Sequence, residues 1–265
     1  MKVKGRLTLI SYKRHEPFIK EHEDRETIIV FTHGILEGPK QFIELSQLAY
    51  KRGHSVSALL LPGHGGSGVD FASSNSRKWM EYLEESLSQI KKQYNSIILV
   101  GHSMGALLSV LAYSKDSRKI DGIVALATPL NIRLKVSGMI RSIKIGMGSI
   151  NNENALEVAA ANAFSIEKSS ILTYLSWAPR YIDLFYLVKD TRKKLSNIKV
   201  PLLIVHTKHD EFVSNKTLKL FNKRLNNTHK KIVTLNNSGH FYYDDNDLHV
   251  LKKEFELFLD SLSNA

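Results

Sequence analysis

The sequence predicts an α/β fold built on a mainly parallel, doubly wound sheet. Segments rich in β-branched and aliphatic residues alternate along the chain with segments in which apolar residues recur at helical spacing. The helical segments span 10 to 16 residues, long enough for the right-handed crossovers that connect parallel strands. With 43% hydrophobic and 24% charged residues, the 265-residue chain has the composition of a globular protein large enough for one such domain.

The first half of the chain contains most of the predicted strands. Residues 6–12 alternate as in a half-buried edge strand, whereas Thr27–Thr32 is a continuous apolar and β-branched run, typical of a strand covered on both faces. A helix over 38–52 is predicted to end at Gly53, and a strand over 55–61 is predicted to end before Pro62. The other elements predicted here are a helix over 79–94, a strand over 96–100, a helix over 103–113 and a strand over 122–127.

The alternation of strands and helices stops in the middle of the second half. Residues 129–197 contain no strand-like run, only amphipathic segments such as 154–164. Strands are predicted again over 200–206 and 231–235, and helices over 216–225 and 248–262, the last of them introduced by the acidic run at 244–247. We therefore predict an α/β core of residues 1–129 and 197–265, with residues 130–196 (the inserted segment) as a helical unit.

The composition excludes several classes of site. The chain has no cysteine, which excludes disulfides, thiolate catalysis and iron–sulfur clusters. No apolar run approaches the roughly 18 residues of a membrane span, and the first residues lack the apolar stretch of a secretion signal. A cytoplasmic protein is therefore expected.

The net charge of +11 is unevenly distributed. Residues 1–20 carry +5 and residues 130–199 carry +6, whereas residues 21–129 carry −1 and residues 200–265 carry +1. No nucleic-acid-binding motif accompanies this excess, so no nucleic-acid partner is expected. A solvated face is one interpretation of the basic inserted segment. The other is peripheral contact with an anionic membrane, at the inner membrane face.

The strongest motif is G-H-S-M-G at residues 101–105. It follows the predicted strand over 96–100 and precedes an apolar helix, which is the context of the G-x-S-x-G nucleophile elbow. Ser103 is therefore the candidate nucleophile, and a plain turn is the alternative.

A serine hydroxyl needs a base to take its proton and a third group to orient that base. Asp210 directly follows the strand over 200–206, and His240 follows the strand over 231–235. The order Ser103, Asp210, His240 matches the order of nucleophile, acid and histidine in α/β hydrolases. Glu211 and Asp244 remain alternatives for the acid.

An acyl-transfer site also needs donors for the developing oxyanion, usually two backbone N–H groups. Met104, which follows the candidate nucleophile, would supply one. Ile35, which follows His33 and Gly34 at the end of the first core strand, would supply the other. The alternative is that Gly34 only ends the strand and that His33 packs in the core.

Two further patterns predict no site. Residues 63–68 match G-x-G-x-x-G, but Pro62 and a polar loop through Ser76 separate them from the next helix, so we predict a mobile loop near the site entrance and not a nucleotide site. No histidine pair has metal-ligand spacing. No cofactor and no metal are therefore predicted.

Taken together, F-T-H-G-I at 31–35, L-P-G-H-G at 61–65, G-H-S-M-G at 101–105, H-D-E-F-V at 209–213 and S-G-H at 238–240 resemble the α/β-hydrolase superfamily. The nearest likeness is the bacterial carboxylesterase and monoacylglycerol lipase branch. The resemblance implies Ser103 as nucleophile, His240 as general base and then acid, and Asp210 as its orienter, with the N–H groups of Ile35 and Met104 as oxyanion hole. It also implies that residues 130–196 form a helical cap placed after the sixth strand.

The resemblance further implies a cofactor-independent serine hydrolase that cleaves lipid-like carboxylic esters, either short- to medium-chain acyl esters or monoacylglycerols. The same triad acting on carbon–carbon bonds or amides, and a non-catalytic ligand sensor, are alternatives. Candidate substrate-binding residues in the inserted segment are Trp177, Ile145 and Phe185, and other residues that could line an acyl channel are Ile140, Ile143, Met147, Ile171 and Leu172. Asn152, Glu153 and Glu157 would suit a polyol, although a solvated helix face would have the same composition.

Overall fold

A computed structural model describes residues 15–23, 26–133, 135–146, 149–225 and 229–263. Within these residues, seven strands form one sheet in the order β1-β3-β2-β4-β5-β6-β7. Only β1 is antiparallel to its neighbour, and the other five pairs are parallel. The strands are β1 (Phe18–Lys20), β2 (Thr27–Thr32), β3 (Ser55–Ala58), β4 (Ser96–His102), β5 (Ile120–Leu126), β6 (Leu202–Thr207) and β7 (Lys230–Leu235). This is the mainly parallel, doubly wound sheet that the sequence predicts.

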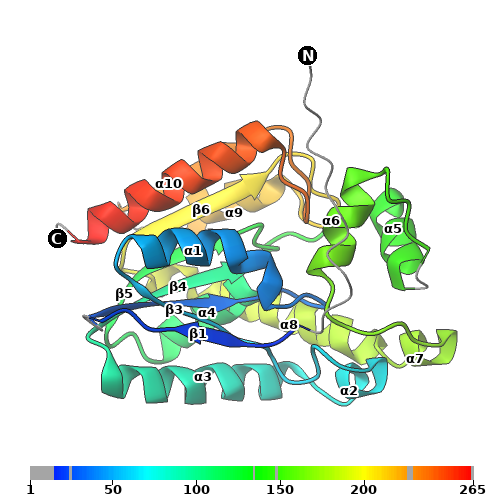
Figure 1. Ribbon diagram of the computed structural model, residues 1–265, viewed down its shortest axis with the longest axis horizontal. Coiled ribbons are helices and arrows are strands. Elements are labelled where there is room, and N and C mark those ends of the chain that lie inside the picture. The colour runs from blue at the N-terminus through cyan, green and yellow to red at the C-terminus, as the bar shows by residue number, and fades with distance from the viewer. Residues whose placement is uncertain (1–14, 24–25, 134, 147–148, 226–228, 264–265) are drawn as a thin grey trace.

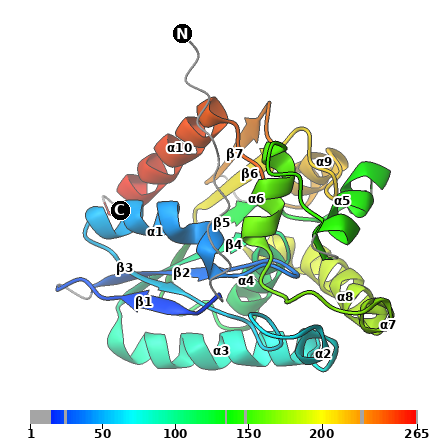
Figure 2. The same cartoon turned by 45° about the vertical axis from the view of Figure 1, so that its right-hand side comes forward.

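Helices cover both faces of the sheet (Figures 1 and 2). One face packs against α1 (Ile43–Lys51), which the short 3-10 helix η1 (Pro39–Phe42) precedes, and α10 (Asp245–Ser263). The other face packs against α3 (Ser76–Gln93), α4 (Met104–Lys115) and α9 (Lys216–Arg224). Along β2, Ile28 and Val30 belong to one core cluster and Ile29 and Phe31 to the other. The continuous apolar run therefore arises because both sides of this strand are buried.

Two parts of the N-terminal region differ from the prediction. Strand β1 was not predicted, and β3 ends at Ala58 although its apolar pattern continues to Leu61. The predicted strand over 6–12 lies outside the described residues. The other predicted strands and helices are confirmed, with ends that shift by a few residues.

The loop predicted after Pro62 and through Ser76 is irregular only in part, and its mobility stays a prediction. The loop contains a short helix, α2 (Gly68–Ala72), because Ser67 and Asp70 form a capping box. The indole Nε1 of Trp177 donates to the carbonyl of Gly68 at 2.8 Å, and the guanidinium of Arg180 donates to the carbonyl of Ala72 at 2.7 Å. These contacts from distant residues organise a segment whose small polar residues alone indicated a loop.

The segment between β5 and β6 holds α5 (Val136–Gly146), α6 (Ala155–Ala163), α7 (Ile171–Leu175) and α8 (Ala178–Lys194), followed by the 3-10 helix η2 (Leu195–Asn197). Helix α8 packs against α4, whereas α5, α6 and α7 lie beyond the carboxyl ends of the strands (Figure 2). Isolated bridges join Phe164 to Glu37 and Ile132 to Val213. The expected boundaries of the inserted segment, and its place after a sixth strand, stay predictions.

Candidate active site

Ser103 lies on a tight turn between β4 and α4. Its backbone has φ 52° and ψ −117°, a strained conformation for a residue with a side chain. A Cβ on Gly105 would lie 1.9 Å from the carbonyl oxygen of Thr32, and one on Gly101 would lie 2.4 Å from the backbone of Ala106. Only glycine fits at these two positions, which explains the G-x-S-x-G spacing and allows the tight turn that places the serine hydroxyl at the end of the strand.

The fold brings Ser103, Asp210 and His240 together although they are far apart in sequence. His240 Nε2 lies 3.1 Å from Ser103 Oγ, and His240 Nδ1 lies 2.8 Å from Asp210 Oδ2. Asp210 also accepts hydrogen bonds from the Thr207 hydroxyl at 2.9 Å and from the N–H groups of Phe212 and Val213, each at 2.8 Å. The carboxylate is thereby oriented toward the imidazole from the end of β6.

The charges of this pair depend on each other. Burial alone would raise the pKa of Asp210, but the charge of His240 and the hydrogen bonds from His240, Phe212 and Val213 bring that pKa below its usual value. Burial alone would lower the pKa of His240, but the charge and hydrogen bond of Asp210 raise it above its usual value. An ionised carboxylate only accepts hydrogen bonds, so Nδ1 carries the proton and the lone pair of Nε2 faces the serine hydroxyl.

The two alternative acids make other contacts. Glu211 Oε2 accepts the backbone N–H of His240 at 3.0 Å, and its other oxygen pairs with Arg141. Asp244 accepts the N–H of Asn246 at 3.1 Å. Among the described residues, Asp210 is the carboxylate that bonds the imidazole of His240, while Glu211 supports the loop that carries it.

The oxyanion donors predicted at Ile35 and Met104 lie on two segments in direct contact, because Gly105 packs against the end of β2. Among the described residues, no hydrogen bond uses the N–H of Ile35, and the N–H of Met104 belongs to the first turn of α4, which has no intrahelical partner. His33 accepts the N–H of Leu61 at 3.0 Å and donates to Gly34 at 2.8 Å. Burial lowers the pKa of His33 to about 3, so this histidine is a neutral support for the turn.

Two residues of the site were not singled out from the sequence. Glu37 has no exposed surface and accepts hydrogen bonds from the N–H of Gly34 at 2.7 Å, the side chain of Gln41 at 2.6 Å and the ring of His102 at 2.8 Å. His102 immediately precedes Ser103. The available signal was a lone acidic residue in the apolar loop G-I-L-E-G-P, directly after the candidate oxyanion turn.

A cavity of about 450 Å³ adjoins the candidate site. His102 and His240 lie in its wall. The apolar part of the wall comes from η1, α1, α6 and α10 and the loop after β7, and includes Phe42, Leu45, Ala163, Phe164, Phe241 and Leu251. A mostly apolar chamber beside a histidine suits the apolar part of a substrate.

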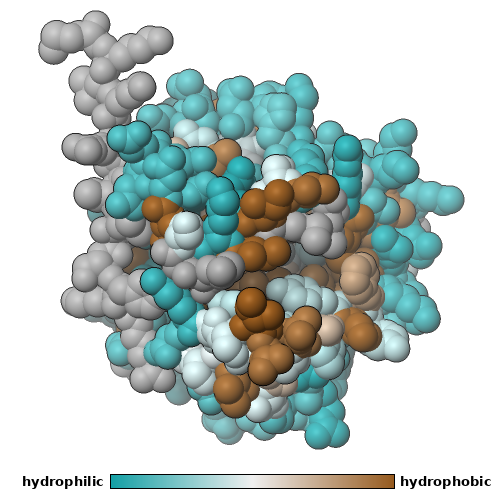
Figure 3. All heavy atoms as spheres, turned by 90° about the vertical axis from the view of Figure 1, so that its right-hand side faces the viewer, coloured by the Kyte–Doolittle hydropathy of each residue, from teal (hydrophilic) through white to brown (hydrophobic). Residues whose placement is uncertain are grey.

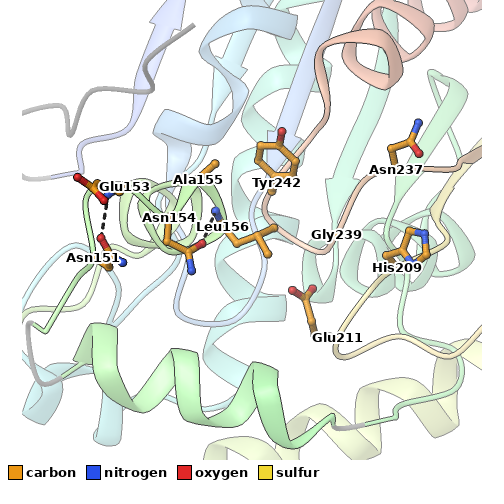
Figure 4. A pocket seen from close by; sticks show the side chains of 10 residues that line it. All are labelled: Asn151, Glu153, Asn154, Ala155, Leu156, His209, Glu211, Asn237, Gly239 and Tyr242. Carbon is orange, nitrogen blue, oxygen red and sulfur yellow. Dashed lines mark hydrogen bonds between the residues drawn. The ribbon is translucent and has the colours of Figure 1, made fainter. Parts of the chain in front are cut away.

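A second cavity, of about 700 Å³, is polar and open (Figure 4). Its lining residues are Asn151, Glu153, Asn154, Ala155, Leu156, His209, Glu211, Asn237, Gly239 and Tyr242. The oxygens of Asn151 and Asn154 are occupied by the N–H groups of Glu153 and Leu156, at 3.0 and 3.1 Å. Of the three residues suggested for a polyol, Glu153 lines this cavity, whereas Glu157 is buried and accepts the N–H of Asn151.

The candidate substrate-binding residues of the inserted segment line neither of these two cavities. Trp177 is buried against Phe71, with ring centroids 5.0 Å apart, and Ile145 is also buried. Phe185 is 54% exposed on α8. Met147 lies outside the described residues. Contact of these side chains with substrate stays a prediction.

A family model described as serine aminopeptidase, S33 (Hydrolase_4), matches residues 23–247. The chain belongs to the Hydrolase_4 family. The thermostable monoacylglycerol lipase of Bacillus sp. (strain H-257) is 26% identical to this Hydrolase_4 protein over 246 residues, which is 92% of this chain and 94% of the relative. The resemblance to the monoacylglycerol lipase branch of the α/β hydrolases is thereby confirmed.

Solved structures agree with this fold. The monoacylglycerol lipase of Paleococcus ferrophilus superimposes with a TM-score of 0.69 at 18% identity, over 94% of this chain and 99% of that one. A structure from work on the metagenome-derived lipolytic enzymes LipS and LipT has a TM-score of 0.73 at 17% identity, over 93% and 98% of the two chains. Among the described residues, no helix combines the length and apolar character needed to cross a membrane.

Proposed function

We propose that this Hydrolase_4 protein is a serine esterase that cleaves lipid-like carboxylic esters through an acyl-enzyme on Ser103. The observation that carries the proposal is the single imidazole of His240, which bonds the hydroxyl of Ser103 at 3.1 Å and the carboxylate of Asp210 at 2.8 Å. Ligand binding alone would need neither the strained serine turn nor the oriented base.

In the proposed mechanism, Ser103 Oγ attacks the ester carbonyl carbon while His240 Nε2 takes the hydroxyl proton. Asp210 stabilises the resulting imidazolium, and the N–H groups of Ile35 and Met104 bind the oxyanion. When the tetrahedral intermediate collapses, His240 returns the proton to the leaving alcohol oxygen. Water then attacks the acyl carbon while His240 takes its proton. When this second intermediate collapses, the bond from the acyl carbon to Ser103 Oγ breaks, His240 returns the proton to Oγ, and the acid leaves.

Two observations support short- to medium-chain acyl esters or monoacylglycerols as substrates. The cavity of about 450 Å³ beside His240 has largely apolar walls, which would hold an acyl chain. The relative from Bacillus sp. (strain H-257) is named a monoacylglycerol lipase. The open cavity near Glu153 and Glu211, with its several polar side chains, would suit a hydroxylated alcohol group.

The proposal includes peripheral contact with a lipid surface. Large apolar side chains are exposed together on the face formed by α5, α7 and α8 (Figure 3), where they include Val136, Ile140, Ile143, Ile171, Leu172, Leu175, Ile182 and Phe185. Arg133 and Lys144 are exposed on the same segment, and basic residues are attracted to anionic lipid by about 1 kcal/mol each. Exposed large apolar side chains near basic residues are typical of a surface that meets lipid.

A fluorophosphonate probe tests the serine chemistry. We expect the wild type to be labelled and Ser103→Ala, which removes only one oxygen atom, to remain unlabelled with an unchanged melting temperature. A folded wild type that does not react would refute the proposal. Acyl p-nitrophenyl esters and monoacylglycerols of 2 to 16 carbons, compared with aminoacyl anilides, then measure the substrate preference. Faster anilide hydrolysis would show an amidase.

A further inference from the structure

The carboxylate of Glu37 is bonded on one oxygen only. All three of its hydrogen bonds, from the N–H of Gly34, the side chain of Gln41 and the ring of His102, fall on Oε2. Among the described residues, no donor bonds Oε1, which is fully buried. This oxygen lies 3.9 Å from Nε2 of His240, the same nitrogen that faces Ser103. Glu37 is therefore a second buried carboxylate close to the base: it lies near Nε2 of His240, whereas Asp210 bonds Nδ1.

His102 extends this contact to the loop of His240. Its Nδ1 lies 2.8 Å from Glu37 Oε2, and its Nε2 lies 3.1 Å from the carbonyl oxygen of His240. Both partners accept hydrogen bonds, so the ring of His102 lies between two acceptors and donates to them. Glu37 and His102 thus connect the turn after β2, the turn after β4 and the loop after β7.

The ligand atoms of Glu37, His102 and His240 lie within 4.8 Å of one another, a spacing that a metal ion could also use. A metal needs a nitrogen lone pair from each histidine. Both nitrogens of His102 lie at hydrogen-bond distance from acceptors, at 2.8 and 3.1 Å. The geometry therefore favours a hydrogen-bonded bridge over a metal site.

We propose that Glu37 is a positioning residue for the hydrolysis, acting through Gly34, His102 and His240. Its Oε2 bonds the N–H of Gly34 and so holds the turn that carries the N–H of Ile35. The same oxygen bonds His102, which in turn bonds the loop that carries His240. Its Oε1 stabilises the imidazolium that forms when His240 takes the proton of Ser103. The inference rests on the proposed function, because it assigns the surroundings of the same base.

The charges of Glu37 and of the groups around His240 support this positioning role. Burial would raise the pKa of Glu37, but the charge and hydrogen bond of His102 and the charge of His240 bring that pKa below its usual value, so the residue is ionised. The groups that face His240 are Asp210, Glu37, Glu211 with its partner Arg141, and His102. Burial lowers the pKa of His240, while Asp210 first, then Glu37 and Glu211, raise it. Removing the charge of Glu37 therefore lowers the pKa of the base.

The test compares Glu37→Gln with Asp247→Asn on p-nitrophenyl butyrate. Asp247 is the matched control, because it is also a buried carboxylate that supports the loop leading to His240. It bonds Asn237 N–H and the Ser238 hydroxyl, both at 2.7 Å, and no imidazole. For Glu37→Gln we expect kcat to fall roughly 10- to 100-fold with KM within about twofold, and the acid limb of kcat/KM to move to lower pH. For Asp247→Asn we expect a lower melting temperature and an unmoved acid limb.

The outcomes separate this inference from the proposed function. If the wild type reacts with the fluorophosphonate probe but a folded Glu37→Gln keeps both its kcat and its acid limb, the role of Glu37 is wrong and the esterase proposal stands. If the wild type does not react, the proposed function itself fails. Should Glu37→Gln not fold, His102→Gln replaces it, since it removes one of the two bonds of the bridge. An unchanged kcat in that variant would equally overturn the inference.

Discussion

The loops at the carboxyl ends of the strands and the helices of the inserted segment differ in how far their side chains are buried. In the loops, Ser103, Asp210 and His240 are buried and joined by hydrogen bonds. In the inserted segment, large apolar residues such as Ile171, Leu172 and Leu175 are more than 65% exposed. The contrast fits the proposed division of roles, in which preorganised groups in the loops would perform the chemistry and the exposed apolar side chains of the helices would face the lipid-like substrate.

The largest effect expected in the loops comes from Asp210→Asn. Without the carboxylate, His240 loses the partner that sets its tautomer, so we expect kcat to fall on the order of 10⁴-fold, as in comparable triads. Circular dichroism and kcat on a soluble ester measure fold and rate. Glu211→Gln is the control and should lower kcat less than about tenfold, because Glu211 bonds the backbone N–H of His240 and the guanidinium of Arg141 and not the imidazole. The reverse ranking would show that Glu211 is the acid.

The pH dependence is the next largest effect. The proposed mechanism needs neutral His240, whose pKa lies above the usual 6.5 because the charge and hydrogen bond of Asp210 outweigh burial. We expect kcat/KM to rise with pH through a midpoint above 6.5 and to fall about tenfold for each pH unit below that midpoint. The rate of fluorophosphonate labelling, measured over the same pH range, should have the same midpoint. A midpoint below 6.5 would contradict the proposed surroundings of the base.

The exposed helices should have a smaller and more selective effect. We expect the double variant Leu172→Ser, Leu175→Ser to hydrolyse p-nitrophenyl butyrate at the wild-type rate, but to bind anionic vesicles about fivefold more weakly, because less apolar surface is buried in lipid. Vesicle sedimentation and hydrolysis of a vesicle-borne ester measure this. Leu257→Ser is the matched control, because Leu257 is a leucine that is 46% exposed on α10, away from α5, α7 and α8. If the wild type and the double variant bind the vesicles equally, the exposed side chains of Leu172 and Leu175 do not contact lipid, and the proposed difference in role between the helices and the loops is wrong.

The smallest expected effect concerns the contact between Trp177 of the inserted segment and α2. Trp177→Phe keeps an aromatic ring against Phe71 but removes the indole bond to the carbonyl of Gly68. We expect the free energy of unfolding to decrease by about 1 kcal/mol, with little change in kcat on a soluble ester. Urea unfolding measures this. His209→Phe, at an exposed loop position, is the control for a general effect of substitution.

Most of the core was predictable because its signals are local. Apolar periodicity identified β2, β4, β6 and β7, and the strand-glycine-serine-glycine-helix order identified Ser103. Strand β1 was missed because three residues carry too little pattern, and α2 was missed because its capping box and its contact with Trp177 combine local and distant residues. Periodicity showed that the inserted segment is helical. It did not show which apolar residues of that segment are exposed, because exposure depends on what packs beside them.

The sequence by itself determined the sheet, the nucleophile turn and the order of serine, acid and histidine, since each follows from neighbouring residues. Only the tertiary structure shows that Asp210 bonds the imidazole of His240, whereas its neighbour Glu211 bonds the backbone N–H of His240. It also decided that Glu37 and His102 meet His240, a contact between the ends of three separate strands. The physical reason is that backbone patterning is a property of short segments, whereas the pairing of buried charges is set by the strand order that brings distant loops together.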